Sequence, residues 1–464
     1  MTRLKLYTLS AILILSFTYC GKRNQKIIEH PNIIFIYTDD QRQDAAGFNA
    51  NDVIYTPALD KLAKQGIRFN NACVVMAFCS PSRAALLTGR YGSANGVLKL
   101  GSDLNPDEKT IAHYLKNAGY STAISGKWHI GRPPSECGFD FHVYFEGNGD
   151  YFNRKTIDMG TELRPEIHCD EYCVNRSVDF LKEAVKNDKP FFLFHNTQLP
   201  HMNHEHKWPA QPETKAKYNQ ADMPVAENRL DDLSNKPEYL KTVRNLTQAK
   251  KYGYPDVDAI QSHTLDYYSV ISEMDDFLGK LLSTVEELGL RENTYIFFMS
   301  DNGWMLGEHG FTSKVLPYQA STSVPLFVVG PDIKPGENND VVLNIDFLPT
   351  ILELADVQLP ENIHGESVLP ILQNKNVEWR EHFIHEGIEG FGGIKPHLAV
   401  IGSDYRYIET YADRTLSSVN FVELYDMKKD PLEMNNLARD SSMKTVVENL
   451  KQKIERHKKE VLGM

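Results

Sequence analysis

Four strand-like runs, each followed by polar residues, constrain the fold of this chain more than any other feature. They are residues 32–37, 121–125, 191–194 and 294–300, and segments with helical spacing of apolar residues lie between them. Continuous apolar runs are typical of strands buried on both faces of a parallel sheet, and parallel strands need long, usually helical, crossovers. We therefore predict an α/β fold in which a large, mostly parallel sheet is sandwiched by helices.

The remaining elements are assigned from periodicity and from helix start and stop signals. A further strand is predicted over 324–329. Helices are predicted over residues 56–66, 110–117, 171–186, 262–288 and 346–354. Two segments rich in Gly, Pro and polar residues, 131–164 and 202–254, are interpreted as loop excursions. After a polar linker at 373–378, strands at 398–402 and 405–409 and a helix over 443–460 predict a smaller C-terminal unit.

Polar side chains follow all four strand-like runs at their carboxyl ends. In an open α/β sheet, ligands bind just outside the carboxyl ends of the strands, so we expect these side chains to meet at one site. In chain order they are Asp39, Asp40, Lys127, His129, His201, Asp301 and Asn302.

Four of these residues offer hard oxygen ligands. Carboxylate and amide oxygens without a soft ligand suit Ca²⁺ or Mg²⁺, and several carboxylates favour Ca²⁺. Each pair taken alone could equally be a helix cap or a turn, because Asp and Asn are common there. Together, Asp39, Asp40, Asp301 and Asn302 predict a metal site.

The stretch Cys79-Ser80-Pro81-Ser82-Arg83 predicts an anion site with a sulfur atom at its centre. Ser80 suits an N-cap, Pro81 a first helical residue, and Gly89 a helix end, so a short helix is predicted here. Cys79 would lie at the positive end of the helix dipole, and Arg83 adds a guanidinium that can hold an oxyanion. The alternative is a buried cysteine at a loop-to-helix junction with a solvated arginine.

Cys-x-Pro-x-Arg followed by Leu-Thr-Gly-Arg at 87–90 resembles, without a mismatch, the signature of the type I sulfatases. The resemblance extends over nearly the whole chain after the N-terminal segment. It includes residues 38–40, 126–129, 200–201, 300–303, 307–310 with Lys314, and 423–437. It implies an alkaline phosphatase-like catalytic domain over 26–372 and a smaller C-terminal subdomain over 373–464, an antiparallel sheet with a helix.

The resemblance also implies the chemistry. In this family the cysteine is oxidised by a maturase to formylglycine, whose hydrate attacks the sulfur of a sulfate ester, here that of a sulfated carbohydrate. Carried over to this sequence, the metal set is Asp39, Asp40, the Cys79-derived residue, Asp301 and Asn302. The catalytic set is Cys79, Arg83, Lys127, His129, His201 and Lys314. The alternative for the two lysines of this set is a solvated surface position, and the alternative for the two histidines is a structural role.

Sugar contacts are predicted at two places. Trp304, Glu308 and His309 lie close in sequence to Asp301, and Lys395 and His397 accompany the glycine-rich stretch 387–396, for which a plain hairpin connection is the alternative. His204 and His206 could suggest a metal-binding tract. We interpret them as solvated loop residues.

The N-terminus predicts export. Arg3 and Lys5 precede an apolar segment, 9–17, that is too short to span a bilayer and is typical of a signal peptide over 1–19. Cys20 ends a loose lipobox, so we expect a lipidated cysteine and a periplasmic or outer-membrane lipoprotein of a bacterium, held to the membrane only by that anchor. Ordinary secretion is the alternative.

The remaining cysteines and the charge add two constraints. In an oxidising compartment Cys73, Cys137, Cys169 and Cys173 allow three disulfide pairings, among them a local bridge between the last two, and the choice stays open. The net charge of −12 argues against a nucleic-acid partner, and it means that a local basic cleft must attract an anionic substrate.

Two other functions remain open at this point. A phosphodiesterase or phosphonate monoester hydrolase of the same superfamily would use a similar site on a phosphorus ester. A non-catalytic, sulfated-glycan-binding lipoprotein would keep Cys79 as a thiol. The identity of the sugar, the sulfated position, endo or exo action and the oligomeric state also remain open.

Overall fold

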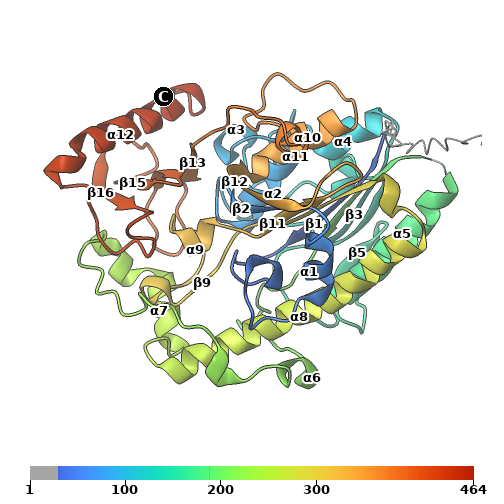
Figure 1. Cartoon of the computed structure of the whole chain (residues 1–464), viewed down its shortest axis with the longest axis horizontal. Coiled ribbons are helices and arrows are strands. Elements are labelled where there is room, and N and C mark those ends of the chain that lie inside the picture. The colour runs from blue at the N-terminus through green and yellow to red at the C-terminus, as the bar shows by residue number, and fades with distance from the viewer. Residues whose placement is uncertain (1–29, 188) are drawn as a thin grey trace, which may run out of the picture.

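The computed structural model describes residues 30–187 and 189–464, so the predicted signal peptide and Cys20 lie outside the described residues. Its largest feature is a ten-stranded sheet, drawn across the centre of Figure 1. In spatial order the strands are β12 (Gly336–Leu343), β2 (Ile67–Cys73), β11 (Leu326–Val329), β8 (Thr294–Ser300), β1 (Asn32–Thr38), β7 (Phe191–Asn196), β3 (Ser121–Lys127), β4 (Phe141–Phe145), β5 (Thr156–Asp158) and β6 (Thr161–Leu163).

The centre of the sheet is parallel, as predicted. Strand β1 pairs in parallel with both β7 and β8, β3 pairs in parallel with β7 and β4, and β2 pairs in parallel with β12. Strand β11 runs antiparallel between β8 and β2, and β5 and β6 add an antiparallel edge. The predicted fold class is therefore confirmed. The interpretation of 131–164 as loops is wrong for β4 to β6, because their short runs lie among Gly and Pro residues that mask them.

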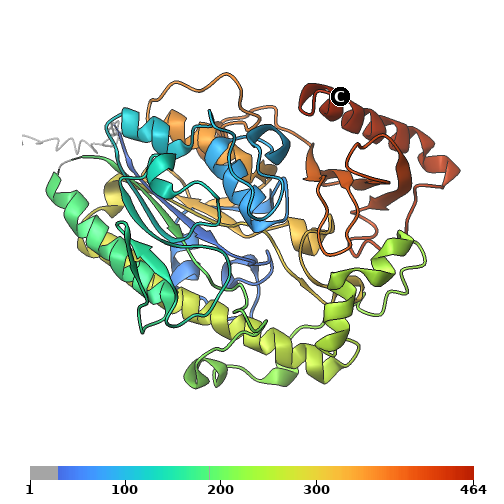
Figure 2. The same cartoon turned by 180° about the vertical axis from the view of Figure 1, so that it is seen from behind.

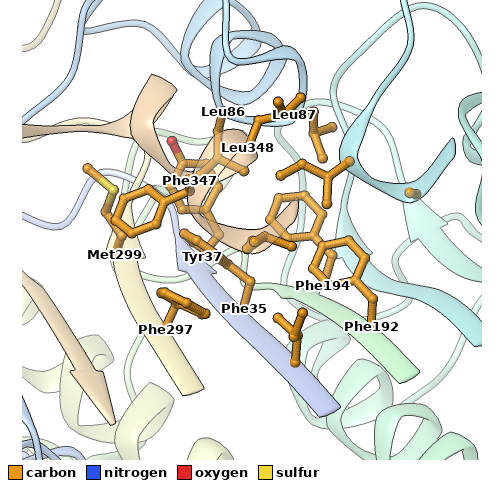
Figure 3. Close-up of a cluster of buried hydrophobic side chains, with 14 of the residues drawn as sticks. Phe35, Tyr37, Leu86, Leu87, Phe192, Phe194, Phe297, Met299, Phe347 and Leu348 are labelled. Atoms are coloured by element: carbon orange, nitrogen blue, oxygen red, sulfur yellow. The ribbon is translucent and has the colours of Figure 1, made fainter. Parts of the chain in front are cut away.

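Each face of the sheet is covered by its own layer of helices. Alternate residues of β1 point to opposite faces. On one face, Phe35 packs against Phe297 and Phe347 (Figure 3). Ile34 lies in the hydrophobic cluster on the other face. The first face is covered by α2 (Cys79–Thr88), α4 (Ile111–Asn117) and α10 (Phe347–Leu354). The second face is covered by α1 (Pro57–Ala63), α5 (Cys169–Ala184) and α8 (Val257–Glu287).

Helix α2 starts earlier than its sequence predicts. The N-cap is Phe78, in extended conformation with φ −152°, and the amide of Ser82 donates to the Phe78 carbonyl at 2.9 Å. Ser80 as the N-cap is therefore wrong. Pro81 is the third helical residue. Proline fits there because the first four N–H groups of a helix have no partner within the helix, so the lack of an N–H loses no hydrogen bond. The helix ends at Gly89, whose φ of 65° is left-handed, as a glycine after a helix allows.

A second, four-stranded antiparallel sheet and a long helix form the C-terminal unit. They are β13 (His382–Gly387), β14 (His397–Gly402), β15 (Tyr405–Tyr411), β16 (Val419–Asp426) and α12 (Lys444–Glu460). Figures 1 and 2 show this unit beside one edge of the large sheet, next to α7 (Arg244–Lys251). Strand β13 contacts the chain just before α2: the Glu386 amide donates to the Val75 carbonyl, and the Ala77 amide donates to His385 Nε2 at 3.0 Å.

The segment 202–254 is an excursion, as expected, but it contains short helices that the sequence analysis did not predict. It holds α6 (Pro212–Lys215) and α7, and its residues pack against α8 and against the C-terminal unit. Shorter elements elsewhere are α3 (Gly92–Asn95), β9 (Met305–Leu306), β10 (Thr312–Ser313), α9 (Gln319–Thr322) and α11 (Leu369–Leu372). Among residues 30–187 and 189–464, no helix combines the length and the apolar character needed to cross a membrane.

The five cysteines in the described part of the chain are free and buried. The expected disulfide pairing among Cys73, Cys137, Cys169 and Cys173 is therefore wrong. Cys169 and Cys173 lie one turn apart on α5, where side chains run alongside each other rather than face to face, so a bond between them would distort the helix.

The carboxyl of Asp275 on α8 links two helices and makes stability depend on pH. It accepts the amides of Ala58 and Leu59 at 2.9 and 2.8 Å, which are unpaired donors at the start of α1. Burial raises its pKa to about 7, although these two hydrogen bonds lower it.

We predict that Asp275→Asn removes this pH dependence. Because the folded pKa lies above the unfolded value, the Asp275 contribution is complete below about pH 4 and is lost as the pH rises through 7. Relative to wild type, the variant should gain roughly 1–4 kcal/mol between pH 4 and pH 8, measured by urea unfolding. A constant difference across that range would contradict the prediction.

Candidate active site

The predicted site residues meet at the carboxyl edge of the sheet because the central strands end in register. Thr38 pairs with Ser300 across β1 and β8, so the next residues, Asp39 and Asp301, come together. The Asp301 amide donates to the Thr38 carbonyl at 2.9 Å, and the Asp40 amide donates to Asp301 Oδ1 at 3.2 Å. The three carboxylates are fully buried.

Cys79, the first residue of α2, lies in the middle of this cluster. Its Sγ is 3.3 Å from Asp39 Oδ1, and it accepts from Lys314 Nζ at 2.7 Å and from Lys127 Nζ at 3.5 Å. Burial and the nearby Asp39 carboxylate raise the pKa of the thiol. The helix N-terminus and the two lysine ammonium groups add positive potential at the same place and act against this rise.

Arg83 holds this arrangement together from one turn further along α2. Its Nε and Nη2 lie 3.0 and 2.9 Å from Asp301 Oδ2, and its Nη1 donates to the Lys127 carbonyl at 3.1 Å. The guanidinium also lies over the Tyr37 ring, and the side chain is 1% exposed. The alternative of a solvated arginine is therefore wrong, because Arg83 connects α2 to the ends of β8 and β3.

Two lysines balance the two aspartates that follow β1. Lys127 pairs with Asp39, and Lys314 pairs with Asp40. Burial raises the pKa of the Asp39 carboxyl, but Lys127, His201 and Lys314 outweigh it and hold that pKa well below its usual range. Burial and the neighbouring Asp39 raise the pKa of Asp301 to about 7, because Arg83 only partly offsets them.

The donor set also fits a hard divalent cation. One ligand atom each from Asp39, Asp40, Cys79 and Asp301 lies within 4.8 Å of the others. In the described part of the chain, Asp40 Oδ2 and Asn302 Oδ1 are buried oxygens without a hydrogen-bond partner. A cation would be a suitable partner for these two oxygens, because carboxylate and amide oxygens are the ligands of Ca²⁺ and Mg²⁺.

Two histidines flank the cluster. His201 Nε2 lies 3.5 Å from Asp40 Oδ2, and its Nδ1 donates to the Met202 carbonyl, so Nε2 of the neutral ring is free to accept. Burial lowers the pKa of His201 to about 4 and that of His129 to about 2. His129 Nδ1 is buried without a hydrogen-bond partner among the described residues, and the left-handed φ of 65° at this residue sets its side-chain direction.

Three supporting residues escaped the sequence analysis. Asp170 on α5 accepts the amides of Gln198 and Leu199 at 2.7 and 2.9 Å, and Tyr151 donates to the His201 carbonyl at 2.8 Å. Both hydrogen-bond to the loop that carries His201. Asn148 accepts from Lys127 Nζ at 3.0 Å. Asp170 directly precedes the helix predicted over 171–186, where an aspartate suggests an N-cap, and nothing in the sequence signals Asn148.

A cavity opens onto Cys79 and Lys314. Its lining is Phe78, Cys79, Leu100, Asn148, His201, Met202, His206, Arg244, Asn245, Gln248, Tyr252, Trp304, Thr312, Ser313, Lys314 and Phe391. Segments far apart in the chain therefore form one chamber, and His206, expected to be a solvated loop residue, lies in its wall.

Of the five residues predicted to contact sugar, Trp304 lines the cavity and the other four do not. Glu308 pairs instead with Arg42, and His309 with Asp231, both at 2.7 Å. His397 is buried in β14, stacked on His385, and its Nδ1 hydrogen-bonds the Lys395 carbonyl. The glycine-rich stretch does reach the cavity, through Phe391 and not through Lys395 or His397.

Comparisons with known proteins agree with this geometry. A family model described as "Sulfatase" matches residues 31–357, and one described as "N-sulphoglucosamine sulphohydrolase, C-terminal" matches residues 307–460. An N-acetylglucosamine-6-O-sulfatase of Bacteroides thetaiotaomicron is 29% identical over 91% of this chain and 85% of its own. An uncharacterized sulfatase of Escherichia coli, YidJ, is 31% identical over 89% of this chain and 84% of its own.

The three-dimensional fold is also similar to that of a solved structure. That structure is described as BT4656 in complex with its substrate D-glucosamine-2-N,6-O-disulfate, it is 28% identical to this chain, and it superposes with a TM-score of 0.84. The match covers 93% of this chain and 98% of the other. The fold and the site thus define a hydrolase of oxyanion esters. More narrowly, the chain belongs to the sulfatase family and is a sulfuric ester hydrolase.

We predict that Arg83→Met lowers the free energy of unfolding by about 3–5 kcal/mol, because it leaves the Asp301 carboxylate buried without its partner. Lys116→Met, in the exposed Lys116–Asp140 pair, is the matched control and should cost at most about 1 kcal/mol. Denaturant unfolding measures both, and equal losses would contradict the prediction.

Proposed function

We propose that this sulfatase removes a sulfate ester from a sulfated carbohydrate of the amino-sugar class, with formylglycine at position 79 and a bound Ca²⁺, or else Mg²⁺. The observation that carries the proposal is the position of Cys79 Sγ, which lies among three buried carboxylates and within 3.5 Å of two lysine ammonium groups. The similarity to an N-acetylglucosamine-6-O-sulfatase supports the amino-sugar class.

Asp39, Asp40, Asp301 and Asn302 would hold the cation, together with the side chain at 79. When bound, the cation supplies a Lewis acid that stabilises negative charge on the attacking oxygen and on the sulfate. Arg83 holds Asp301 in place for this role and lowers the pKa of its carboxyl, and its bonds to Asp301 and to the Lys127 carbonyl fix the start of α2.

The thiol sulfur occupies the position of the formylglycine hydroxyl oxygens. Lys314 and Lys127, whose Nζ atoms already contact that sulfur, would bind sulfate oxygens and balance the charge that builds up as the ester bond breaks. Lys314 would donate a proton to the departing alcohol oxygen, and His201 would do so only after its Nε2 takes up a proton beside the anionic substrate. His129, through its unpartnered Nδ1, would accept a proton from the side chain at 79 when sulfate is released.

The cellular context is also proposed. The apolar segment at 9–17 and the lipobox-like residues up to Cys20 support export and a lipid anchor in a bacterium. The stretch 79–83 is the recognition site that we propose for a formylglycine-generating maturase.

We predict that Cys79→Ala abolishes turnover of sulfate esters while the circular dichroism spectrum and the unfolding midpoint stay close to those of wild type. Mass spectrometry of the wild-type peptide that contains position 79, from a host with the maturase, should show formylglycine. An unmodified thiol there, or full activity of the variant, would refute the mechanism. Matched sulfate and phosphate esters distinguish the function: faster turnover of the phosphate ester would favour a phosphorus-ester hydrolase.

We predict that chelation abolishes activity and that Ca²⁺ restores it. Because an ion that binds only the folded state stabilises by about 2.7 kcal/mol at a hundred times its Kd, Ca²⁺ should also raise the unfolding midpoint of chelated wild type. Asp39→Asn should lose this shift. The control Asp140→Asn, at an exposed acid, should keep it. A shift of equal size in Asp39→Asn would place the cation elsewhere.

A further inference from the structure

The cavity in front of Cys79 carries more positive charge than one sulfate group requires. Its described lining contains Lys314, Arg244 and two histidines, and it contains no aspartate or glutamate, although the whole chain has a net charge of −12. Lys314 is already balanced by Asp40 at the base of the site. The excess positive charge therefore lies with Arg244.

Arg244 is available to a ligand. Within residues 30–187 and 189–464, its guanidinium forms no ion pair with a carboxylate and no hydrogen bond to a protein atom, and the residue is exposed. Exposed arginines without a protein partner are common, so this observation alone does not indicate a binding site. Arg244 differs because it lines the same cavity as Cys79.

The backbone around Arg244 is held in place by the C-terminal unit. The Arg244 amide donates to the Gly392 carbonyl at 2.8 Å, and a Cβ added at Gly392 would come within 3.0 Å of Arg244 Cβ. The guanidinium carbon lies 5.7 Å from the centre of the Phe391 ring. Phe391 in turn lies 4.9 Å, between ring centres, from Phe78, the residue that precedes Cys79. Two aromatic rings thus connect the guanidinium to the reacting position.

His206 lies on the same side of the chamber. It lines the cavity, and burial and the positive charge of Arg244 lower its pKa, so the two side chains are within electrostatic reach of each other. Gln248, one turn after Arg244 on α7, also lines the cavity and donates to Tyr252 Oη at 3.0 Å. The cavity wall formed by α7 therefore presents one cation and further polar groups, and no acid.

We propose that Arg244 is a specificity-determining residue that binds a second anionic group of the substrate, a sulfate or a carboxylate, while the scissile sulfate occupies the site between Lys127 and Lys314. The preferred substrate is then a saccharide with two anionic groups, whose sugar ring lies along Phe391. A guanidinium suits both oxyanions because its planar fork can donate two parallel hydrogen bonds. This inference rests on the proposed function, because it assigns the scissile group to the Cys79 end of the cavity.

The test uses the matured full-length chain and three substrates. These are glucosamine 6-sulfate, glucosamine 2-N,6-O-disulfate, and a disaccharide in which a uronic acid is joined to glucosamine 6-sulfate. Wild type should prefer one dianionic substrate in kcat/KM. Arg244→Ala should lose about 10- to 100-fold on that substrate, mainly through KM, the range expected for a hydrogen bond to a charged group. On the monosulfated sugar it should stay within about twofold of wild type.

The substrates on which Arg244→Ala loses kcat/KM identify the second anionic group and test whether Arg244 binds it. Loss on the disulfated sugar alone indicates a sulfate on the same ring, and loss on the disaccharide alone indicates a neighbouring carboxylate. Arg244→Lys should recover only part of the loss, because lysine keeps the charge and lacks the fork. Lys250→Ala, an exposed cation on α7 outside the cavity, should behave as wild type on all three. Equal losses on all substrates, or no loss, would overturn the proposal.

A binding measurement separates this inference from the proposed function. Calorimetry of Cys79→Ala with glucosamine 2-N,6-O-disulfate and with the disaccharide, repeated with Arg244→Ala added, should show a Kd at least tenfold weaker in the double variant for one of them. Unchanged Kd values for both would overturn the role of Arg244 even if sulfate esters are hydrolysed. If matured wild type hydrolyses no sulfate ester, the proposed function fails instead, and the Kd comparison still decides the role of Arg244.

Discussion

The structure depends most on the charge balance inside one buried cluster. Asp39, Asp40 and Asp301 are fully buried, and each faces a cation: Lys127, Lys314 and Arg83 respectively. Unpaired carboxylates at this depth would be prohibitively costly, so the strand ends and α2 can pack together only because these partners arrive from three different segments. The same charges make the site suitable for an oxyanion and a divalent cation, which links the stability of the sheet edge to the chemistry.

The C-terminal unit takes part in this arrangement as well. Strand β13 lies along the residues before α2, with His385 accepting the Ala77 amide, so the small sheet supports the segment that delivers Cys79. The glycine-rich stretch between β13 and β14 brings Phe391 into the cavity and holds the start of α7. The carboxyl edge of the large sheet and α2 therefore hold the buried charged cluster, whereas the connection between β13 and β14 and the excursion at 202–254 form much of the cavity wall.

The sequence predicted the reacting end of the site well and the recognition end poorly. The strand-end acids, both lysines and both histidines were identified because each lies in a short local motif, and the register of β1 with β7 and β8 then brings them together. His206 is an exposed loop residue, as predicted, although it also lines the cavity. Lys395 and His397, predicted as sugar contacts, do not line the cavity, whereas Phe391 does. Strands β4 and β13 were also missed, because their short runs lack the unbroken apolar character of the central strands.

What the sequence determined by itself was therefore the class of fold, the sulfatase signature at 79–90 and the polar residues that follow the strands, since periodicity, helix signals and motif spacing are properties of neighbouring residues. What only the tertiary structure decided was the set of partners: Arg83 with Asp301, Asp170 with the His201 loop, and Arg244 with Phe391. These contacts join segments that are distant in the chain. No local pattern encodes them, because they depend on which loops pack against each other once the sheet has formed.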